Sequence, residues 1–424
     1  MLPKVVNLKN NYPKSIVFNH LVDDMQKKEL HYIIHGQGVF IFENTDNNQL
    51  CTFRILNSDK SDGYIVNFLQ KGILIDRIGM DDPLIDKDNT VGLTDMKGAY
   101  YWISLDSQNQ RIICGIGEAR METKTYIYEF TFKNDDDRKK NKKFLESLVT
   151  INISNDSVAL VPMKLLRDPI TSNIPLIIKN THELTMDHIA DNKYLPCANL
   201  SPTAKVLYES ISGKNFVLND KDFPDFSKAI EHSIATEGCW CNTRLKEKEY
   251  DFSKNKPNIL ETYLRITMNT NSGESPGCEF VIEIWAPGHY SPIHSHANSH
   301  AIIRVLNGSI NVSLYPFLNN NIEQFAVANF KKNDIMWISP DLNQIHKLKN
   351  LETNSDTCIT IQCYIYGEAD TIHYDYFDFI DEDGNTQQYE PDSDMDFVEF
   401  KKLMKKEWYE YLAMKKAMSC CSFL

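Results

Sequence analysis

Short runs rich in β-branched and aromatic residues, each followed by a turn-forming stretch, constrain the fold of this chain more than any other feature. Between positions 15 and 153 they read SIVF, LHYII, GVFIFE, LCTFRIL, YIVNFL, YYWISL, RIICGIG and TYIYEFTF, separated by signals such as HGQG, NTDNN and SDKSDG. Short strands at this spacing are typical of all-β sandwiches and barrels. The pattern predicts an antiparallel β-sandwich-like domain of unknown role over residues 1–180.

The pattern changes between positions 181 and 235. The segments TAKVLYESI and FPDFSKAIEHSIA repeat their apolar residues at intervals of three and four, as amphipathic helices do. Ser201 and Asp222 stand where these helices would start. We expect a helical connector over residues 181–250 that packs on the domain that follows.

Strands return from Tyr263 onward in YLRITM, EFVIEIWA, AIIRVL, INVSLYPF, DIMWISP and TCITIQCYIY, with tight turns such as LNGS between them. Near the end the chain becomes helical in DMDFVEFKKLMKKEWYEYLAMKKAM, which we expect to dock on the strands. A chain of 424 residues is too long for one core of typical size. We therefore predict a mainly β protein, in which residues 251–424 form a second β domain with a C-terminal helix.

Composition excludes several classes of function. A formal net charge of -13 and a pI near 5.4 would repel a phosphate backbone, so nucleic acid is not an expected partner. The start lacks the apolar core of a signal peptide, and no apolar run reaches the roughly 18 residues that a membrane span needs. The 10 cysteines show neither disulfide nor paired zinc spacing. We expect a cytoplasmic protein, with a monomer as the favoured state.

The segment GHYSPIHSHANSHAIIRVLNGS places His294 and His296 two residues apart at the opening of a strand. Side chains two apart on an extended backbone share a face, so both imidazoles can bind one cation. His346, in QIHKLKN, follows at the distance that a small barrel needs to return to the same pocket. Three neutral imidazoles leave open positions on Fe(II), or on Zn, Ni or Cu. A solvent-facing pair is the alternative. His289 and His300 are expected beside the site or at the surface, rather than as ligands.

The motifs GHYSPIHSHANSH, the turn glycine after it, QIHKLKN and IQCYIY resemble the cysteine dioxygenase family from about position 261 to 367. That family has the cupin fold, a jelly-roll type β-barrel, and the resemblance implies His294, His296 and His346 as ligands of Fe(2+). Cupins in general carry a glutamate a few residues after the second histidine, and ANSHAIIRV has none. This absence resembles the three-histidine site of thiol dioxygenases.

The resemblance also implies residues for the substrate. Arg265 falls where the family's Tyr-x-Arg motif, which begins here at Tyr263, places a guanidinium for an amino acid carboxylate, and a planar fork suits bidentate pairing. Trp285 in WAPGH stands at a further family position. Tyr364 in IQCYIY matches the catalytic tyrosine of the family. The hydroxyl of that tyrosine can form a hydrogen bond with iron-bound oxygen or with the substrate carboxylate. An ordinary core tyrosine is the alternative for Tyr364.

Two positions depart from the family pattern. The cysteine that crosslinks to the tyrosine in animal enzymes is Ala301 here, so Tyr364 cannot form that thioether. Gln362 replaces the histidine of the family's Ser-x-His-x-Tyr relay, while Thr360 keeps a hydroxyl at the first position. Glutamine can form a hydrogen bond with a tyrosine but cannot shuttle a proton near neutral pH as histidine can. We expect Gln362 and Thr360 beside the catalytic tyrosine, with an altered rate or substrate choice.

The resemblance implies an oxidoreductase of cysteine catabolism and taurine biosynthesis. Its substrates would be O2 and L-cysteine, or a close carboxylated thiol such as 3-mercaptopropionate, and its product the sulfinic acid. One alternative is a non-catalytic cupin that binds a metal or a small ligand, which Gln362 favours. Another is a different metal-dependent cupin enzyme, such as a sugar phosphate isomerase, although Arg265 alone is a poor phosphate site.

The C-terminal sequence SCCSFL suggests lipidation. Cys421 opens a four-residue CSFL box with the terminal leucine of a geranylgeranylation signal, and Cys420 before it is a candidate for palmitoylation. A frayed apolar tail is the alternative. We expect contact with a membrane only if this box is prenylated.

Overall fold

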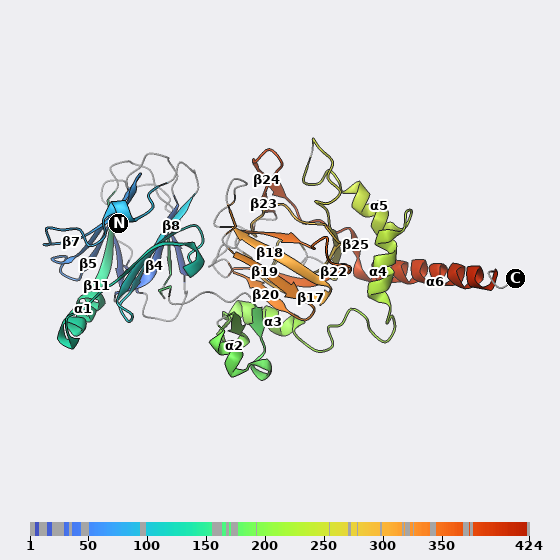
Figure 1. Ribbon diagram of the computed structural model, residues 1–424, viewed down its shortest axis with the longest axis horizontal. Coiled ribbons are helices and arrows are strands. Elements are labelled where there is room, and N and C mark those ends of the chain that lie inside the picture. The colour runs from blue at the N-terminus through green and yellow to red at the C-terminus, as the bar shows by residue number, and fades with distance from the viewer. Residues whose placement is uncertain are drawn as a thin grey trace. The chain divides into compact units, whose positions relative to one another are not determined.

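The computed structural model divides the chain into two compact units, residues 1–173 and 174–424, which are described separately below (Figure 1). None of the described helices is long and apolar enough to cross a membrane. The structure describes all residues except 1–4, 8–14, 19–28, 34–35, 44–50, 94–98, 155–162, 167–168, 171–176, 192, 254, 270–272, 278, 297–298, 316–317, 319–322, 325, 340–344, 368–372, 374–375 and 422–424.

The first unit contains two six-stranded sheets, with the strand orders β1-β3-β11-β5-β6-β7 and β10-β9-β8-β4-β12-β2. It also contains helix α1 (Asp135–Ser147) and 3-10 helices at Lys87–Asn89 and Met121–Thr123. The strands are β1 (Val5–Asn7), β2 (Ser15–Phe18), β3 (Glu29–Ile33), β4 (Gln37–Glu43), β5 (Cys51–Asn57), β6 (Gly63–Leu69), β7 (Gly72–Arg77), β8 (Tyr100–Asp106), β9 (Arg111–Ile116), β10 (Lys124–Glu129), β11 (Leu148–Ser154) and β12 (Met163–Leu166).

The two sheets of the first unit share one apolar core. Phe42 of β4 contacts Phe53 and Phe68 of the other sheet, with ring centroids 5.1 and 4.5 Å apart. Side chains alternate between the two faces of a strand, and β4 accordingly directs Phe40 and Phe42 into this core and Val39 and Ile41 into a second cluster. The predicted antiparallel sandwich is confirmed, and among the described strands of this unit one pairing, between β1 and β3, is parallel.

The second unit contains an eight-stranded sheet (β14-β13-β20-β17-β22-β16-β15-β25), a three-stranded sheet (β19-β18-β21) and a two-stranded pair (β23-β24). The strands are β13 (Ile177–Lys179), β14 (Tyr194–Pro196), β15 (Leu264–Thr267), β16 (Phe280–Trp285), β17 (Ser299–Asn307), β18 (Ser309–Tyr315), β19 (Ala326–Lys331), β20 (Ile335–Ile338), β21 (Ile345–Lys349), β22 (Cys358–Tyr366), β23 (Phe377–Ile380), β24 (Thr386–Tyr389) and β25 (Met395–Asp396).

Helices cover one face of the eight-stranded sheet, and the three-stranded sheet faces the other (Figure 1). This arrangement gives the unit two cores, one on each side of the large sheet. It confirms the predicted mainly β fold with a jelly-roll type domain and packed helices. The helices are α2 (Met186–Ala190), α3 (Pro202–Ile211), α4 (Phe226–Ala235), α5 (Trp240–Glu247) and α6 (Phe397–Cys421), with 3-10 helices at Thr181–Glu183 and Cys197–Asn199.

Strand β22 is buried on both faces, and its alternation separates two environments. Ile359, Ile361 and Cys363 belong to the core under the helices. Cys358 and Tyr364 belong to the core under the three-stranded sheet. We call the face toward the three-stranded sheet the inner face of the large sheet. Because successive side chains point to opposite faces, the residues between Cys358 and Tyr364 at even positions also lie on the inner face.

Helix starts differ slightly from the sequence-based expectation. The side chain of Ser201 caps α3 as predicted, by accepting from the backbone of Ala204. Helix α4 begins at Phe226 rather than near Asp222. The carboxylate of Asp220 accepts from the backbone of Asp222 and holds it in a turn, and Pro224 disfavours helical geometry in the residue before it.

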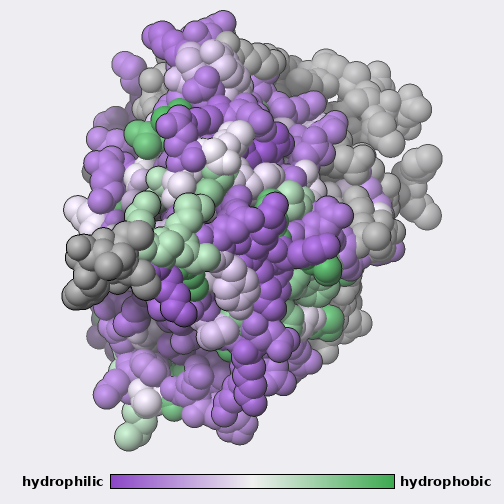
Figure 2. Space-filling model, turned by 90° about the vertical axis from the view of Figure 1, so that its right-hand side faces the viewer, coloured by the Kyte–Doolittle hydropathy of each residue, from purple (hydrophilic) through white to green (hydrophobic). Residues whose placement is uncertain are grey.

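The division between the units falls at 173/174, whereas the sequence placed it at 180/181. The segment in between contains β13, which pairs with β20 through Ile178 and Ile335 and so joins the second unit. In α6, Phe400 and Met404 are buried against the helical core, while Met414 and Met418 are exposed. Figure 2, viewed from the end toward which α6 points, shows a mostly hydrophilic face with scattered apolar side chains.

Candidate metal centre

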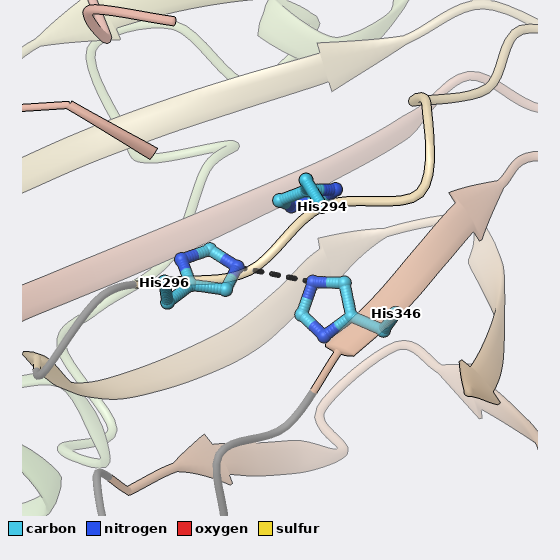
Figure 3. Close-up of side chains that lie close together, drawn as sticks. All are labelled: His294, His296 and His346. Atoms are coloured by element: carbon cyan, nitrogen blue, oxygen red, sulfur yellow. Dashed lines mark hydrogen bonds between the residues drawn. The ribbon is translucent and has the colours of Figure 1, made fainter. Parts of the chain in front are cut away.

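Backbone pairing brings the three predicted histidine ligands together. His294 and His346 lie opposite each other in an isolated antiparallel bridge, and each backbone N–H donates to the other's carbonyl at 3.0 and 3.1 Å. His296 follows two residues later, on the same face. The three side chains each offer a ligand atom, and these atoms lie within 4.8 Å of one another (Figure 3).

The geometry of the three rings fits a metal ion. The Nε2 atoms of His296 and His346 are 3.1 Å apart, and two imidazole nitrogens that each bind one ion at about 2.1 Å lie roughly 3 Å apart. The His294 Nδ1 lies 3.0 Å from the carbonyl oxygen of Pro292. A carbonyl can only accept, so Nδ1 carries the proton and Nε2 is left as a free acceptor.

The electrostatics of the site also suit a metal. Burial lowers the pKa of His294 to about 4, and burial followed by the neighbouring imidazoles lowers the pKa values of His296 and His346 well below their ordinary value. Neutral imidazole is the form that binds metals. Three neutral donors leave several positions of a cation such as Fe(II) open for other ligands. The site can therefore hold a cation that also binds a substrate and a small gas molecule.

A small cavity of about 30 Å³ opens beside the histidines on the inner face of the large sheet. Apolar side chains, among them Phe252, Ile310, Met336 and Phe379, form much of its wall. Every residue that the sequence nominated for metal, substrate or tyrosine relay also lines it: Tyr263, Arg265, Trp285, His294, His296, His346, Thr360, Gln362 and Tyr364. The structure thus places these residues together, and their individual roles stay predictions.

Aromatic stacking holds one side of the cavity. The ring of Tyr263 stacks on Trp285, with centroids 4.2 Å apart and planes 18° from parallel. Phe252 packs on the same tyrosine at 6.0 Å. Such offset pairs add to the free energy gained from burial alone. Tyr263 and Trp285 therefore serve at least as a rigid wall for whatever the cavity binds.

A buried chain of polar contacts crosses the cavity, and the sequence-based reasoning missed its central member, Glu283. Arg265 donates from Nη1 to Glu283 Oε1 at 2.7 Å. Gln362 donates from Nε2 to Glu283 Oε2 and accepts the hydroxyl proton of Tyr364 at Oε1. Thr360 lies 3.3 Å from the same Gln362 nitrogen.

The signal for Glu283 was present in EFVIEIW. Strand alternation puts Glu283 on the same face as Trp285, and an ionisable residue at an inward position of an apolar strand is rarely buried without a partner. Burial raises the pKa of Glu283 and the Arg265 guanidinium opposes that rise. Burial also raises the pKa of Tyr364, so the tyrosine hydroxyl keeps its proton near neutral pH.

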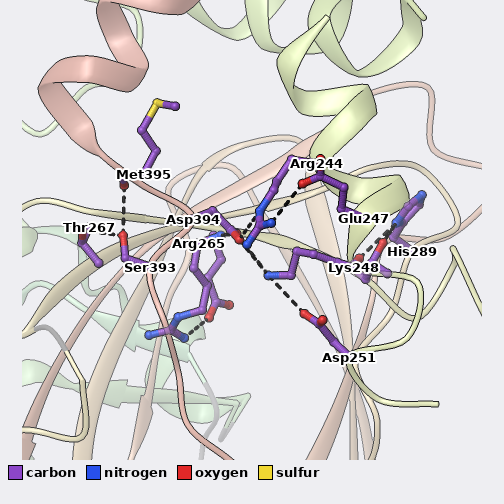
Figure 4. Close-up of polar contacts among 12 residues, drawn as sticks. Arg244, Glu247, Lys248, Asp251, Arg265, Thr267, His289, Ser393, Asp394 and Met395 are labelled. Carbon is purple, nitrogen blue, oxygen red and sulfur yellow. Dashed lines mark hydrogen bonds and ion pairs between the residues drawn. The ribbon is translucent and has the colours of Figure 1, made fainter. Parts of the chain in front are cut away.

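A second cluster missed by the sequence holds the strand of Arg265 in place (Figure 4). The carboxylate of Asp394 accepts from the Arg265 backbone N–H at 2.7 Å. The same carboxylate accepts from Lys248 Nζ at 3.1 Å and from Arg244 Nε at 2.9 Å. Asp394 directly precedes β25, which runs parallel to β15. The cluster ties helix α5, the strand of Arg265 and the segment before α6 to one another.

Neighbouring histidines lie outside the cavity lining. His289 contacts Thr262 through Nδ1, at 3.0 Å from the carbonyl oxygen and 3.1 Å from the hydroxyl. His300 is buried on β17. Ala301 lies on β17 directly opposite Tyr364, where the resemblance places the crosslinking cysteine.

Four further cysteines lie in or directly before two helices of the second unit. Cys241 is buried in α5, where its thiol lies 3.8 Å from the sulfur of Met404, and Cys239 is partly buried. The helix α6 extends to Cys421. The side chains of Cys420 and Cys421 and all of residues 422–424 lie outside the described part of the chain, so lipidation of the CSFL box stays a prediction.

Residues 252–375 match the family model described as cysteine dioxygenase type I. This segment contains the three histidines and the whole polar chain around Glu283, and the predicted resemblance is therefore confirmed for the C-terminal half. A dioxygenase is an oxidoreductase, so this match suggests an oxidoreductase domain in this part of the chain.

Similarity to solved structures is low. The L-ribose isomerase of Acinetobacter sp. DL28 is 12% identical, with 21% of this chain and 47% of that chain covered and a TM-score of 0.18. The Cnp3 cupin domain of Schizosaccharomyces pombe is 10% identical, with coverage of 25% and 65% and a TM-score of 0.19. A cupin 2 domain-containing protein from Halorhodospira halophila is 15% identical, with coverage of 32% and 73% and a TM-score of 0.20. The chain thus spans about half of the ribose isomerase, and scores this low carry no functional argument.

Proposed function

We propose that this protein is an iron-dependent thiol dioxygenase, which adds both atoms of O2 to the sulfur of a small thiol and yields the sulfinic acid. The observation that supports it best is the convergence of three buried, neutral imidazoles in the segment that matches the cysteine dioxygenase family. L-Cysteine and 3-mercaptopropionate are the first thiols to test, because they are the substrates that the family resemblance implies.

Three groups of residues would have separate roles in this reaction. His294, His296 and His346 would hold Fe(II), which supplies the redox chemistry with O2 and favours the thiolate form of the substrate. Arg265 offers Nε and Nη2, which have no hydrogen-bond partner among the described residues, to an acceptor on the substrate. Tyr364 keeps its hydroxyl proton and donates it to Gln362 Oε1, so its hydroxyl oxygen is left as a hydrogen-bond acceptor beside the cavity.

A non-catalytic, metal-binding role is the second candidate, and Gln362 is the observation that favours it. The hydroxyl of Tyr364 donates to the amide oxygen of Gln362, and an amide does not exchange a proton near neutral pH as an imidazole does. If proton transfer through this position limits turnover, the protein would bind metal without consuming oxygen.

The deciding experiment combines metal analysis with an oxygen assay. The protein is loaded with Fe(II) and supplied with cysteine, cysteamine and 3-mercaptopropionate, while oxygen uptake and sulfinate mass are measured. We expect sulfinate from at least one thiol, loss of both iron and sulfinate in His296→Ala, and retention of both in His182→Ala, an exposed histidine. Bound iron without sulfinate from any thiol would establish the non-catalytic role, and a preference for zinc would refute the proposal.

A further inference from the structure

We propose that Glu283 makes the cavity select thiols whose far end is an uncharged oxygen acceptor, such as an amide or ester carbonyl, over thiols that end in a carboxylate. The proposal deepens the proposed function, on which it rests for the fate of the sulfur. It concerns the part of the substrate that meets Arg265, and it can be tested without turnover.

The first support is the pairing of Arg265 with Glu283. The two residues lie directly opposite each other on β15 and β16 and project from the inner face of the sheet. Their side chains are 2% and 5% exposed and meet at 2.7 Å. A buried charge is stable only when it is paired and hydrogen-bonded. Glu283 therefore already compensates the positive charge that a substrate carboxylate would otherwise neutralise.

The second support is that Glu283 is held from both sides. Oε1 accepts from Arg265 and Oε2 accepts from Gln362, the pattern expected of an ionised carboxylate. The orientation of Gln362 is set by Tyr364, whose hydroxyl donates to the amide oxygen and leaves the amide nitrogen to face Glu283. For Glu283 to move away from Arg265, it would have to give up both of these buried hydrogen bonds.

The third support is that Arg265 has two further nitrogen atoms that can donate to a ligand. Its Nε and Nη2 are buried and have no hydrogen-bond partner among the described residues, which makes an acceptor in the cavity favourable. A carboxylate there would place two anions on one guanidinium. At an effective dielectric of about 20, repulsion from Glu283 at about 6 Å cancels roughly a hundredfold of the affinity that a carboxylate gains from Arg265. The cost of taking the carboxylate out of water remains and weakens its binding. An uncharged carbonyl uses the same donors without adding charge.

L-Cysteine and L-cysteinamide form a matched pair of probes, because they share the thiol and the amine and differ only at the carboxylate. Their affinities are measured by calorimetry on the Fe(II)-loaded full chain without oxygen. We expect the wild type to bind cysteinamide at least tenfold more tightly than cysteine. Glu283→Gln, which keeps the size and removes the charge, should reverse the order because Arg265 becomes an uncompensated cation.

Controls separate this effect from a loss of folding or of net charge. Glu352→Gln removes one exposed carboxylate outside the cavity and should leave the ratio of the two affinities unchanged. Glu283→Leu serves as a second variant should Glu283→Gln fail to fold, and it should likewise favour cysteine.

Each outcome has a distinct meaning. A wild type that binds cysteine as tightly as cysteinamide, or a ratio that neither Glu283 variant changes, overturns the selectivity proposal even if sulfinate forms. The expected binding order without any sulfinate in air supports the role of Glu283 and refutes the dioxygenase function.

Discussion

Replacing Asp394 by asparagine tests whether the cluster behind Arg265 stabilises the second unit. The Asp394 side chain is 2% exposed and Lys248 is 4% exposed, so the substitution keeps the shape and leaves a buried ammonium without its nearest anion. Removing one partner of a buried ion pair costs about 3–5 kcal/mol. Asp251 lies 3.7 Å from the same Lys248 nitrogen and retains part of the attraction. We therefore expect Asp394→Asn to lower the free energy of unfolding by about 3 kcal/mol.

Urea unfolding of the metal-free chain measures this loss. Four of the five tryptophans, Trp240, Trp285, Trp337 and Trp408, lie in residues 174–424, so tryptophan fluorescence reports mainly on the second unit. With a denaturant dependence of about 2 kcal/mol per molar urea, a loss of about 3 kcal/mol lowers the midpoint by about 1.5 M.

Two variants make the result decisive. Glu247→Gln removes the other anion of Arg244, but Glu247 is 57% exposed, so its loss should change stability by no more than about 0.5 kcal/mol. Lys248→Met, combined with Asp394→Asn, removes the stranded charge and should recover more than half of the loss. A cost below about 1 kcal/mol for Asp394→Asn, or no recovery in the double variant, would refute the reasoning.

Three further predictions concern the site and its surroundings. Chelation of the metal should lower the thermal midpoint of the wild type and leave that of His296→Ala unchanged, because the metal stabilises only a chain that binds it; equal shifts would contradict the ligand assignment. Burial raises the pKa of Glu261 to about 7, so its contribution to stability is present below its ordinary value of 4.5 and lost as pH rises through 7. Glu261→Gln should therefore gain stability relative to the wild type between about pH 4.5 and 7, and a constant difference in unfolding free energy would disprove this. Gln362→His should add an ionisation to the pH profile of sulfinate formation, and an unchanged profile would exclude this position from proton transfer.

Local sequence pattern was sufficient to predict that the three histidines lie together. The spacing of His294 and His296 shows that they share a face, and the return of the next strands places His346 nearby. The family resemblance alone pointed to Arg265, Gln362 and Tyr364, which line the cavity with the histidines. These predictions needed only the periodicity of single strands and the family resemblance.

Contacts that depend on strand pairing could not be predicted in this way. Glu283 lies opposite Arg265 only through the register of β15 and β16. Asp394 meets the backbone of Arg265 from 129 positions away in the sequence, through a parallel pairing that no local pattern signals. Strand alternation indicates that Glu283 faces inward, but only the folded sheet shows its partner. Asp394 looks like an ordinary acidic residue in a chain that has 58 of them.

The two-sided burial of β22 has a consequence for how such a site can change over time. Ile359, Ile361 and Cys363 hold the helices, whereas Thr360, Gln362 and Tyr364 line the cavity. The odd positions of this strand are therefore constrained by packing against the helices, and the even positions by the chemistry of the cavity. A mutation at an even position can alter the chemistry while the helical core stays intact, so new activities can arise on this strand by single substitutions.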